Sequence, residues 1–148
     1  MPLALKFDRE KITKLSSEIF NSIRRLKELA GVPKDDFLTN VHLIASAKYF
    51  LIVSIEACID MCYHLISKNR FRVPEDYADT FKVMGEVGIF DREFVKRLVE
   101  MAKFRNRLVH IYWDVSDETV YEIIRKDIQD IEEFIERFMK ALNLGAVK

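Results

Sequence analysis

A long apolar run, Val41–Leu65, constrains the fold of this chain more than any other feature. From Tyr49 onward its residues are apolar nearly all the way round a helix, which is typical of an element that is buried on every side. Three charged residues interrupt the run: Lys48, Glu56 and Asp60. These charges argue against a membrane span. We therefore predict a long helix, from about Asp36 to Lys68, as the central element of the fold.

Two further stretches have apolar residues spaced three and four apart, which predicts helices with one buried face. The first follows Asp8, a residue suited to capping a helix, and is ended by Gly31 and Pro33. Its apolar stripe consists of Ile12, Leu15, Ile19, Ile23, Leu26 and Ala30. The second follows Ser116 and is expected to end at Gly145. Its stripe consists of Val120, Ile124, Ile128, Ile131, Ile135, Phe138 and Leu142.

The remaining segments predict one short helix and one longer helix. Pro74 closes a loop before a short helix that begins at Glu75, and Gly85 interrupts that helix. Asp91 caps the longer helix, and residues 111–115 connect it to the last one. No alternation typical of strands occurs. We predict an all-α fold, an up-and-down four-helix bundle with an additional short helix, as a single domain over residues 1–148.

The overall charge excludes one simple mode of nucleic-acid binding. The chain carries 24 Lys and Arg against 24 Asp and Glu, so its net charge is zero. A protein that binds nucleic acid through its overall field is usually basic, so any RNA contact must come from a local patch. Cys58 and Cys62 lie one turn apart in the apolar run, and we expect core thiols there and no metal site. No secretory signal is visible, and we expect a cytoplasmic protein.

The most distinctive segment is Phe104–Asp114, which places two arginines, an amide, a histidine and a tyrosine at the end of an apolar helix. Asn106 and His110 are four residues apart and share one face of a helix. Arg105 is five residues before His110 and lies roughly 140° away around the helix. A single straight helix therefore does not bring Arg105 and His110 together. Either the helix ends near His110, or a second chain completes the pair.

These residue types suit chemistry on a phosphodiester. Histidine exchanges protons near neutral pH, and arginine presents a planar fork of donors to phosphate oxygens. The structural alternative is that Arg105 and Arg107 pair with acids such as Glu56, Asp60 or Asp114, while His110 stabilises a helix end. For Glu56 and Asp60, two interpretations stay open. They orient an arginine across the core, or they reach solvent at the rim of a dimer.

The pattern Arg105-Asn106-x3-His110 resembles the Arg-x4-6-His motif of HEPN domains, and Tyr112 extends it to Arg-x4-His-x-Tyr. This longer form is similar to HepT-like toxins, which are encoded beside a minimal nucleotidyltransferase antitoxin. The segment Ile55–Met61 resembles the central helix of the same family. The resemblance implies a homodimer whose two motifs line a shared groove. It also implies a metal-independent endoribonuclease, with Arg105, Asn106 and His110 as its catalytic residues.

The resemblance assigns Tyr112 a separate role. In the similar toxins, the antitoxin transfers AMP from ATP onto the tyrosine at this position, so ATP serves the partner and the toxin itself needs no cofactor. The alternative is that Tyr112 and Trp113 are amphipathic packing residues. An alternative function also stays open, in which the chain is a non-catalytic HEPN module that binds a nucleotide or RNA and acts as the nucleotidyltransferase's partner.

Secondary candidates for RNA contact lie outside the motif core. Lys68, Arg70 and Arg72 surround Phe71 in a loop, an arrangement that offers cations for phosphates and a ring for stacking. Ordinary solvated loop charge is the alternative. Arg107 is either a second cation of the site or a structural ion-pair partner. We expect His64 to be a core or interface histidine rather than a catalytic one.

Overall fold

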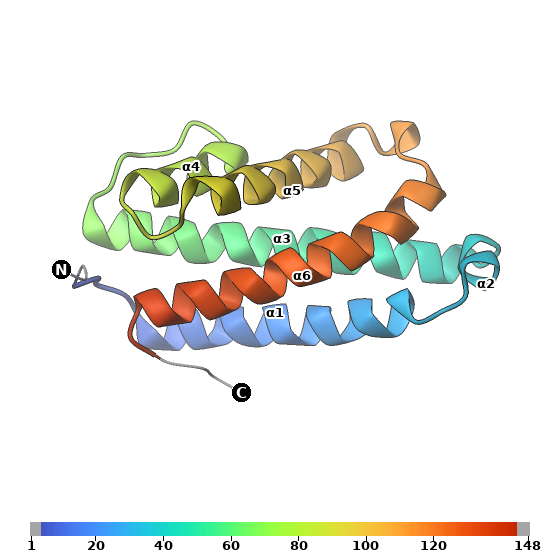
Figure 1. Ribbon diagram of the computed structural model, residues 1–148, viewed down its shortest axis with the longest axis horizontal. Helices are drawn as coiled ribbons and strands as arrows, with labels where there is room; N and C mark the ends of the chain where they lie inside the picture. The colour runs from blue at the N-terminus through green and yellow to red at the C-terminus, as the bar shows by residue number, and fades with distance from the viewer. Residues whose placement is uncertain (1–3, 145–148) are drawn as a thin grey trace.

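Four long helices lie side by side in the computed structural model, which describes residues 4–144 (Figure 1). They are α1 (Arg9–Ala30), α3 (Val41–Asn69), α5 (Arg92–His110) and α6 (Asp117–Ala141). Two short helices, α2 (Lys34–Leu38) and α4 (Tyr77–Glu86), and a 3-10 turn, η1 (Tyr112–Asp114), complete the order. The predicted all-α bundle is confirmed, with two short helices where the sequence predicted one.

Helix α3 is the centre of the bundle, as predicted, and α1, α4, α5 and α6 all pack against it. Its inward residues, such as Leu51, Ile55 and Met61, are fully buried. Cys58 and Cys62 are buried free thiols, which confirms their expected place in the core. By length and composition α3 is apolar enough to cross a membrane, but most of that apolar stretch is buried by the other helices, as in the core helix of a soluble protein.

The predicted start of the central helix at Asp36 is wrong, because the chain breaks into two helices at Thr39 and Asn40. The Asn40 side chain accepts hydrogen bonds from the backbone N–H groups of His42 and Leu43, and so caps α3. Before the break, α2 buries Phe37 against the Tyr121 ring of α6, with centroids 5.0 Å apart. The asparagine cap permits a change of direction that a continuous helix would not allow.

Two other predicted helix ends also shift. The helix expected from Glu75 begins at Tyr77, because Asp76 accepts a hydrogen bond from the N–H of Asp79 and acts as the cap. Helix α6 ends at Ala141, where Asn143 adopts a left-handed conformation with φ of 60°. The stop predicted at Gly145 falls outside the described residues.

Helix α5 carries the motif segment away from the loop that follows α3. Asp91 caps its start by accepting from the N–H of Phe94, as predicted. The helix then ends at His110, at the end of the bundle where α3 and α6 begin (Figure 1). An ion pair between Lys48 and Asp117, at 3.7 Å, joins α3 to α6 near this end.

Two carboxylates on α6 are buried one turn apart in the bundle. Asp130 pairs with Arg97 of α5 at 2.9 Å. Among the described residues, Oδ2 of Asp127 has no hydrogen-bond partner, and its side chain is almost fully buried. Burial, and then the charge of Asp130, raise the pKa of Asp127 from 3.8 to about 7.

This pKa makes the free energy of unfolding depend on pH. The folded protein holds a proton on Asp127 that the unfolded chain releases, so the free energy of unfolding falls as the pH rises from about 4 to about 7. We expect Asp127→Asn to remove this fall, which amounts to at most about 4 kcal/mol. Urea unfolding at pH 4.5 and pH 8 measures it. Asp130→Asn is the control, and it should destabilise at both pH values because Arg97 keeps only Glu133 of its two carboxylate partners. Parallel pH profiles for wild type and Asp127→Asn would contradict the assignment.

Candidate functional site

Arg105 is held in place from three sides. Its Nη2 donates to Oε2 of Glu56 on α3 at 3.2 Å, and its Nη1 donates to Oδ1 of Asn106 at 3.2 Å. Its guanidinium carbon lies 4.7 Å from the centre of the Tyr77 ring on α4. The Arg105 side chain is 11% exposed. In the part of the chain that the structure describes, its buried Nε finds no acceptor. We call Arg105 with Glu56 and Tyr77 the Arg105 clamp.

The two acids of the central helix have different surroundings. Glu56 orients Arg105, as one of the two interpretations predicted. Asp60, one turn further on, is exposed and makes no ion pair or hydrogen bond within residues 4–144. Partial burial, and then the charge of Glu56, raise the pKa of Asp60 above its ordinary value. The carboxylate that the arginine needs is therefore Glu56 alone.

Tyr77 is the member of the clamp that the sequence analysis missed. A guanidinium over an aromatic ring is stabilised by about 0.5–1 kcal/mol at partly exposed sites. Tyr77 is the first residue of α4 and lies far from Arg105 along the chain, so no local spacing connects the two. Only the antiparallel packing of α4 against α5 brings them together.

His110 lies apart from Arg105 in the same chain. It is the last residue of α5 and is exposed, whereas Arg105 faces α3 and α4. Asn106 is half-buried and bonds Arg105 rather than His110. Arg107 is exposed and donates to the backbone oxygen of Asp114 at 3.5 Å, which is the long limit of a hydrogen bond. Arg105 and His110 therefore lie on different sides of α5 in the folded chain, as their spacing predicted.

Tyr112 and Trp113 follow His110 in the η1 turn and are 60% and 72% exposed. Their rings meet edge to face, with centroids 5.4 Å apart. Both rings are largely exposed and pack against each other rather than into the buried core of the bundle.

The loop cations predicted for RNA contact lie at and beyond the C-terminal end of α3, whereas His110 and Tyr112 lie at the end of the bundle where α3 begins. Lys68 is three turns beyond Glu56 on α3, roughly 18 Å along the helix axis. Arg72 pairs with Asp79 at 2.7 Å and with Glu86 at 3.1 Å, and its hydrogen bonds lower the pKa of Asp79 to about 2. Arg70 ends α3 in a left-handed conformation. The structure therefore does not bring Lys68, Arg70 and Arg72 to the motif, and Arg72 has a structural role.

His64 belongs to the core, as expected. It is 8% exposed, and its Nε2 accepts a hydrogen bond from the backbone N–H of Asp8 at 2.8 Å. Burial, and then the charge of Lys11, lower its pKa. A neutral imidazole suits this acceptor role, and it ties the start of α1 to α3.

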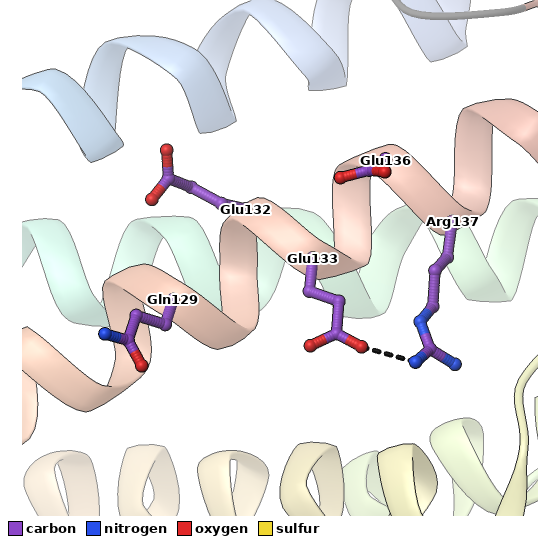
Figure 2. Close-up of a pocket in the computed structure, with 5 residues that line it drawn as sticks. All are labelled: Gln129, Glu132, Glu133, Glu136 and Arg137. Atoms are coloured by element: carbon purple, nitrogen blue, oxygen red, sulfur yellow. Dashed lines mark ion pairs between the residues drawn. The ribbon is translucent and has the colours of Figure 1, made fainter.

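A surface depression lies along α6, and its charge does not suit RNA. Figure 2 shows Glu133 directed toward Arg137, with Glu132 extending toward α1. Glu132 pairs with Lys27 at 2.9 Å, and Arg137 also pairs with Asp91. Glu132 and Glu133 are paired with cations of the fold, whereas Glu136 makes no ion pair among the described residues, and this surplus of carboxylates would repel a phosphate backbone. Over residues 4–144 no cluster of three or more His, Cys, Asp or Glu side chains could hold a metal ion.

Comparison with known proteins defines the class to which this fold and motif belong. The family model described as "Ribonuclease HepT-like" matches residues 19–138, which is most of the chain. The chain therefore belongs to the HepT-like family of HEPN proteins.

Two relatives illustrate the family. The mRNA nuclease HepT of Shewanella oneidensis is 26% identical over 81 residues, which are 55% of this chain and 61% of that protein. The tRNA nuclease HepT of Aphanizomenon flos-aquae is 27% identical over 104 residues, which are 70% of this chain and 71% of that protein. This chain thus matches less than two thirds of the length of the Shewanella relative.

Solved structures share the fold. A tri-AMPylated HEPN toxin of Shewanella oneidensis, in complex with an MNT antitoxin, has a TM-score of 0.83 at 22% identity. The match covers 90% of this chain and 99% of that one. YutE of Bacillus subtilis, a cytosolic protein of unknown function, has a TM-score of 0.79 at 19% identity over 97% and 98% of the two chains. At these identities the likeness concerns the fold alone.

The contrast between Glu56 and Asp60 predicts different costs for two similar substitutions. Glu56→Gln should lower the free energy of unfolding by about 1–3 kcal/mol, because a charged hydrogen bond to a largely buried guanidinium is lost. The matched substitution Asp60→Asn should change it by less than about 0.5 kcal/mol. Urea unfolding of the three proteins measures both values. Equal costs would show that Glu56 does not hold Arg105.

Proposed function

We propose that this chain is a metal-independent endoribonuclease toxin that acts in the cytoplasm and is neutralised by a minimal nucleotidyltransferase antitoxin. The observation that carries the proposal is an anchored Arg105 followed by an exposed His110 at the end of α5, in a member of the HepT-like family. The nuclease names of the two HepT relatives support the same reaction class.

The chemistry needs no bound cofactor, because RNA contains its own nucleophile. The 2′-hydroxyl attacks the neighbouring phosphorus, the 5′-oxygen leaves, and a 2′,3′-cyclic phosphate forms. His110 exchanges the protons of this step, since an imidazole can both accept and donate a proton. Arg105 offers charged donors to the phosphate as negative charge develops, and its clamp limits the reorganisation that this requires. Asn106 keeps Arg105 oriented, and Arg107 is an additional exposed cation.

A homodimer resolves the separation of Arg105 and His110 within one chain. If two motifs face each other across a two-fold axis, His110 of one chain meets the phosphate that Arg105 of the other chain contacts. Exposed apolar residues at this end of the bundle support such an interface. They are Val41, Tyr49, Val109, Ile111 and Trp113.

The reaction predicts loss of cleavage when the histidine is removed. We expect His110→Ala to reduce cleavage of RNA by about 10²- to 10⁴-fold, the usual contribution of an acid–base residue. Purified wild type and variant are compared in the presence of a chelator, with the 2′,3′-cyclic phosphate ends identified by mass spectrometry. Equal cleavage by both proteins would show that another site or a contaminant is responsible.

A second arm of this experiment tests the composite site. Inactive Arg105→Ala and His110→Ala proteins are mixed and allowed to exchange chains. Activity above the sum of the separate proteins is expected, because one site of the mixed dimer has both residues. A protein that sediments only as a monomer at micromolar concentration would contradict the dimer.

The zero net charge of the chain favours a second candidate, a non-catalytic HEPN module that binds a nucleotide or RNA and serves as the nucleotidyltransferase's partner. The cleavage assay separates the two candidates. Absence of cleavage by folded, dimeric wild type that carries no AMP on Tyr112 would favour the binding module.

We propose that Tyr112 is where the antitoxin attaches AMP. Tyr112 is 60% exposed and begins the η1 turn two residues after His110. The Shewanella oneidensis toxin of the same fold carries three AMP groups in complex with its MNT antitoxin. Each added phosphodiester brings about one negative charge beside His110 and Arg107, where substrate phosphate is expected to bind.

Incubation with the partner nucleotidyltransferase and ATP should therefore increase the mass of wild type by one or more AMP units and abolish cleavage. Tyr112→Phe should show no increase in mass and should keep its cleavage activity in the presence of the partner. Intact-protein mass spectrometry and the cleavage assay provide the two measurements. AMP found on the Tyr112→Phe protein would contradict the assignment of Tyr112 as the modified residue.

A further inference from the structure

A depression of about 320 Å³ adjoins the Arg105 clamp, between the middle of α3 and the start of α4. Two tyrosines that are half-exposed, Tyr63 and Tyr77, form part of its walls, with Ile59 and Pro74. We call it the Tyr63–Tyr77 pocket. Its volume lies at the lower end of the range for small-ligand sites, so it suits one flat ring system.

Tyr77 links the pocket to Arg105, the arginine that is proposed to contact the phosphate. The Tyr77 ring lines the pocket and also carries the Arg105 guanidinium, 4.7 Å from the ring centre. Exposed aromatic rings beside a cation are the usual means by which proteins bind single-stranded RNA, with bases stacked on rings and phosphates on arginines. A base held against Tyr63 and Tyr77 would place its own backbone next to Arg105.

The negative charge of the pocket favours a base over a phosphate as its ligand. Asp60, Glu75 and Asp76 line it, and three carboxylates repel a phosphate group. Oδ1 of Asp76 is already used to cap α4. The side chains of Asp60 and Glu75 accept no hydrogen bond from any residue in the described part of the chain. Free carboxylates accept hydrogen bonds from the exocyclic amino groups of bases, as they do from cytosine in nucleic-acid complexes.

We propose that the Tyr63–Tyr77 pocket binds one nucleobase that carries an exocyclic amino group, from a nucleotide flanking the phosphate at Arg105. Adenine, cytosine and guanine have this group. Uracil lacks it, and its one ring N–H donor lies between two carbonyl oxygens that the carboxylates repel. The pocket thereby sets a base preference beside the cleavage position. This inference rests on the proposed ribonuclease function, because it assumes that RNA is the ligand.

A binding experiment tests the pocket separately from catalysis. A fluorescein-labelled 2′-O-methyl oligonucleotide cannot be cleaved, since its nucleophile is blocked, and each position in turn is made abasic. Fluorescence anisotropy gives the dissociation constant of wild type for every member of the series. We expect one position at which loss of the base weakens binding roughly 5- to 150-fold, the effect of one stacked base. Uracil at that position should bind more weakly than adenine or cytosine.

Two variants connect that position to the pocket. Tyr63→Leu leaves Arg105 and Tyr77 unchanged and should bind the intact oligonucleotide more weakly than wild type does. Its dissociation constant should be the same whether or not the base at the sensitive position is present. The double variant Asp60→Asn, Glu75→Gln should keep the abasic effect and lose the preference over uracil. Phe20→Leu is the control, because Phe20 is an exposed aromatic residue of α1 that belongs neither to the pocket nor to the proposed dimer interface, and its abasic effect should equal that of wild type.

The outcomes separate this inference from the ribonuclease proposal. In one outcome, wild type fails to cleave unmodified RNA but shows base-dependent binding that Tyr63→Leu loses. This result would support the pocket proposal and contradict the ribonuclease proposal. If wild type binds no oligonucleotide, or no abasic position matters, the pocket proposal is overturned. An abasic effect that persists unchanged in Tyr63→Leu overturns it as well.

Discussion

Burial of α3 is the constraint on which the rest of the structure depends. The helix is apolar nearly all round, and α1, α4, α5 and α6 cover most of it, although Tyr49, Asp60 and Tyr63 remain exposed. A carboxylate inside such a helix is costly unless it finds a partner. Glu56 pairs with Arg105, and this ion pair joins α3 to α5 at the residue where the motif begins.

The same pairing divides the motif into a fixed part and an accessible part. Arg105 is 11% exposed and is held by Glu56, Asn106 and the Tyr77 ring. His110, Tyr112 and Trp113 lie beyond it, at the end of the helix and in the following turn, and all are exposed. A preorganised cation and an accessible histidine are the arrangement that a composite site between two chains requires. Tyr112 is 60% exposed in that turn, which is compatible with the proposed attachment of AMP by an antitoxin.

The fold could be predicted from the sequence largely because helical periodicity records which faces are buried. The stripes of α1 and α6 and the caps at Asp8, Asp91 and Ser116 identified their helices correctly. The break before Asn40 was missed, although Thr39 and Asn40 are weak helix formers and asparagine is a preferred helix cap. The chain breaks there to bury Phe37 against Tyr121, a contact between residues far apart in the sequence. Spacing also left Glu56 and Asp60 equivalent, since both lie on the same helix one turn apart.

By itself the sequence determined the all-α class, the central position of α3, and the spacing that separates Arg105 from His110 around one helix. These follow from local periodicity and from residue chemistry, which need no knowledge of distant contacts. The tertiary structure alone decided that Glu56 and not Asp60 holds Arg105, that Arg72 pairs with Asp79 and Glu86, and that Tyr77 adjoins the arginine. These contacts join residues on different elements, and only the packing of α4 and α5 onto α3 brings them together.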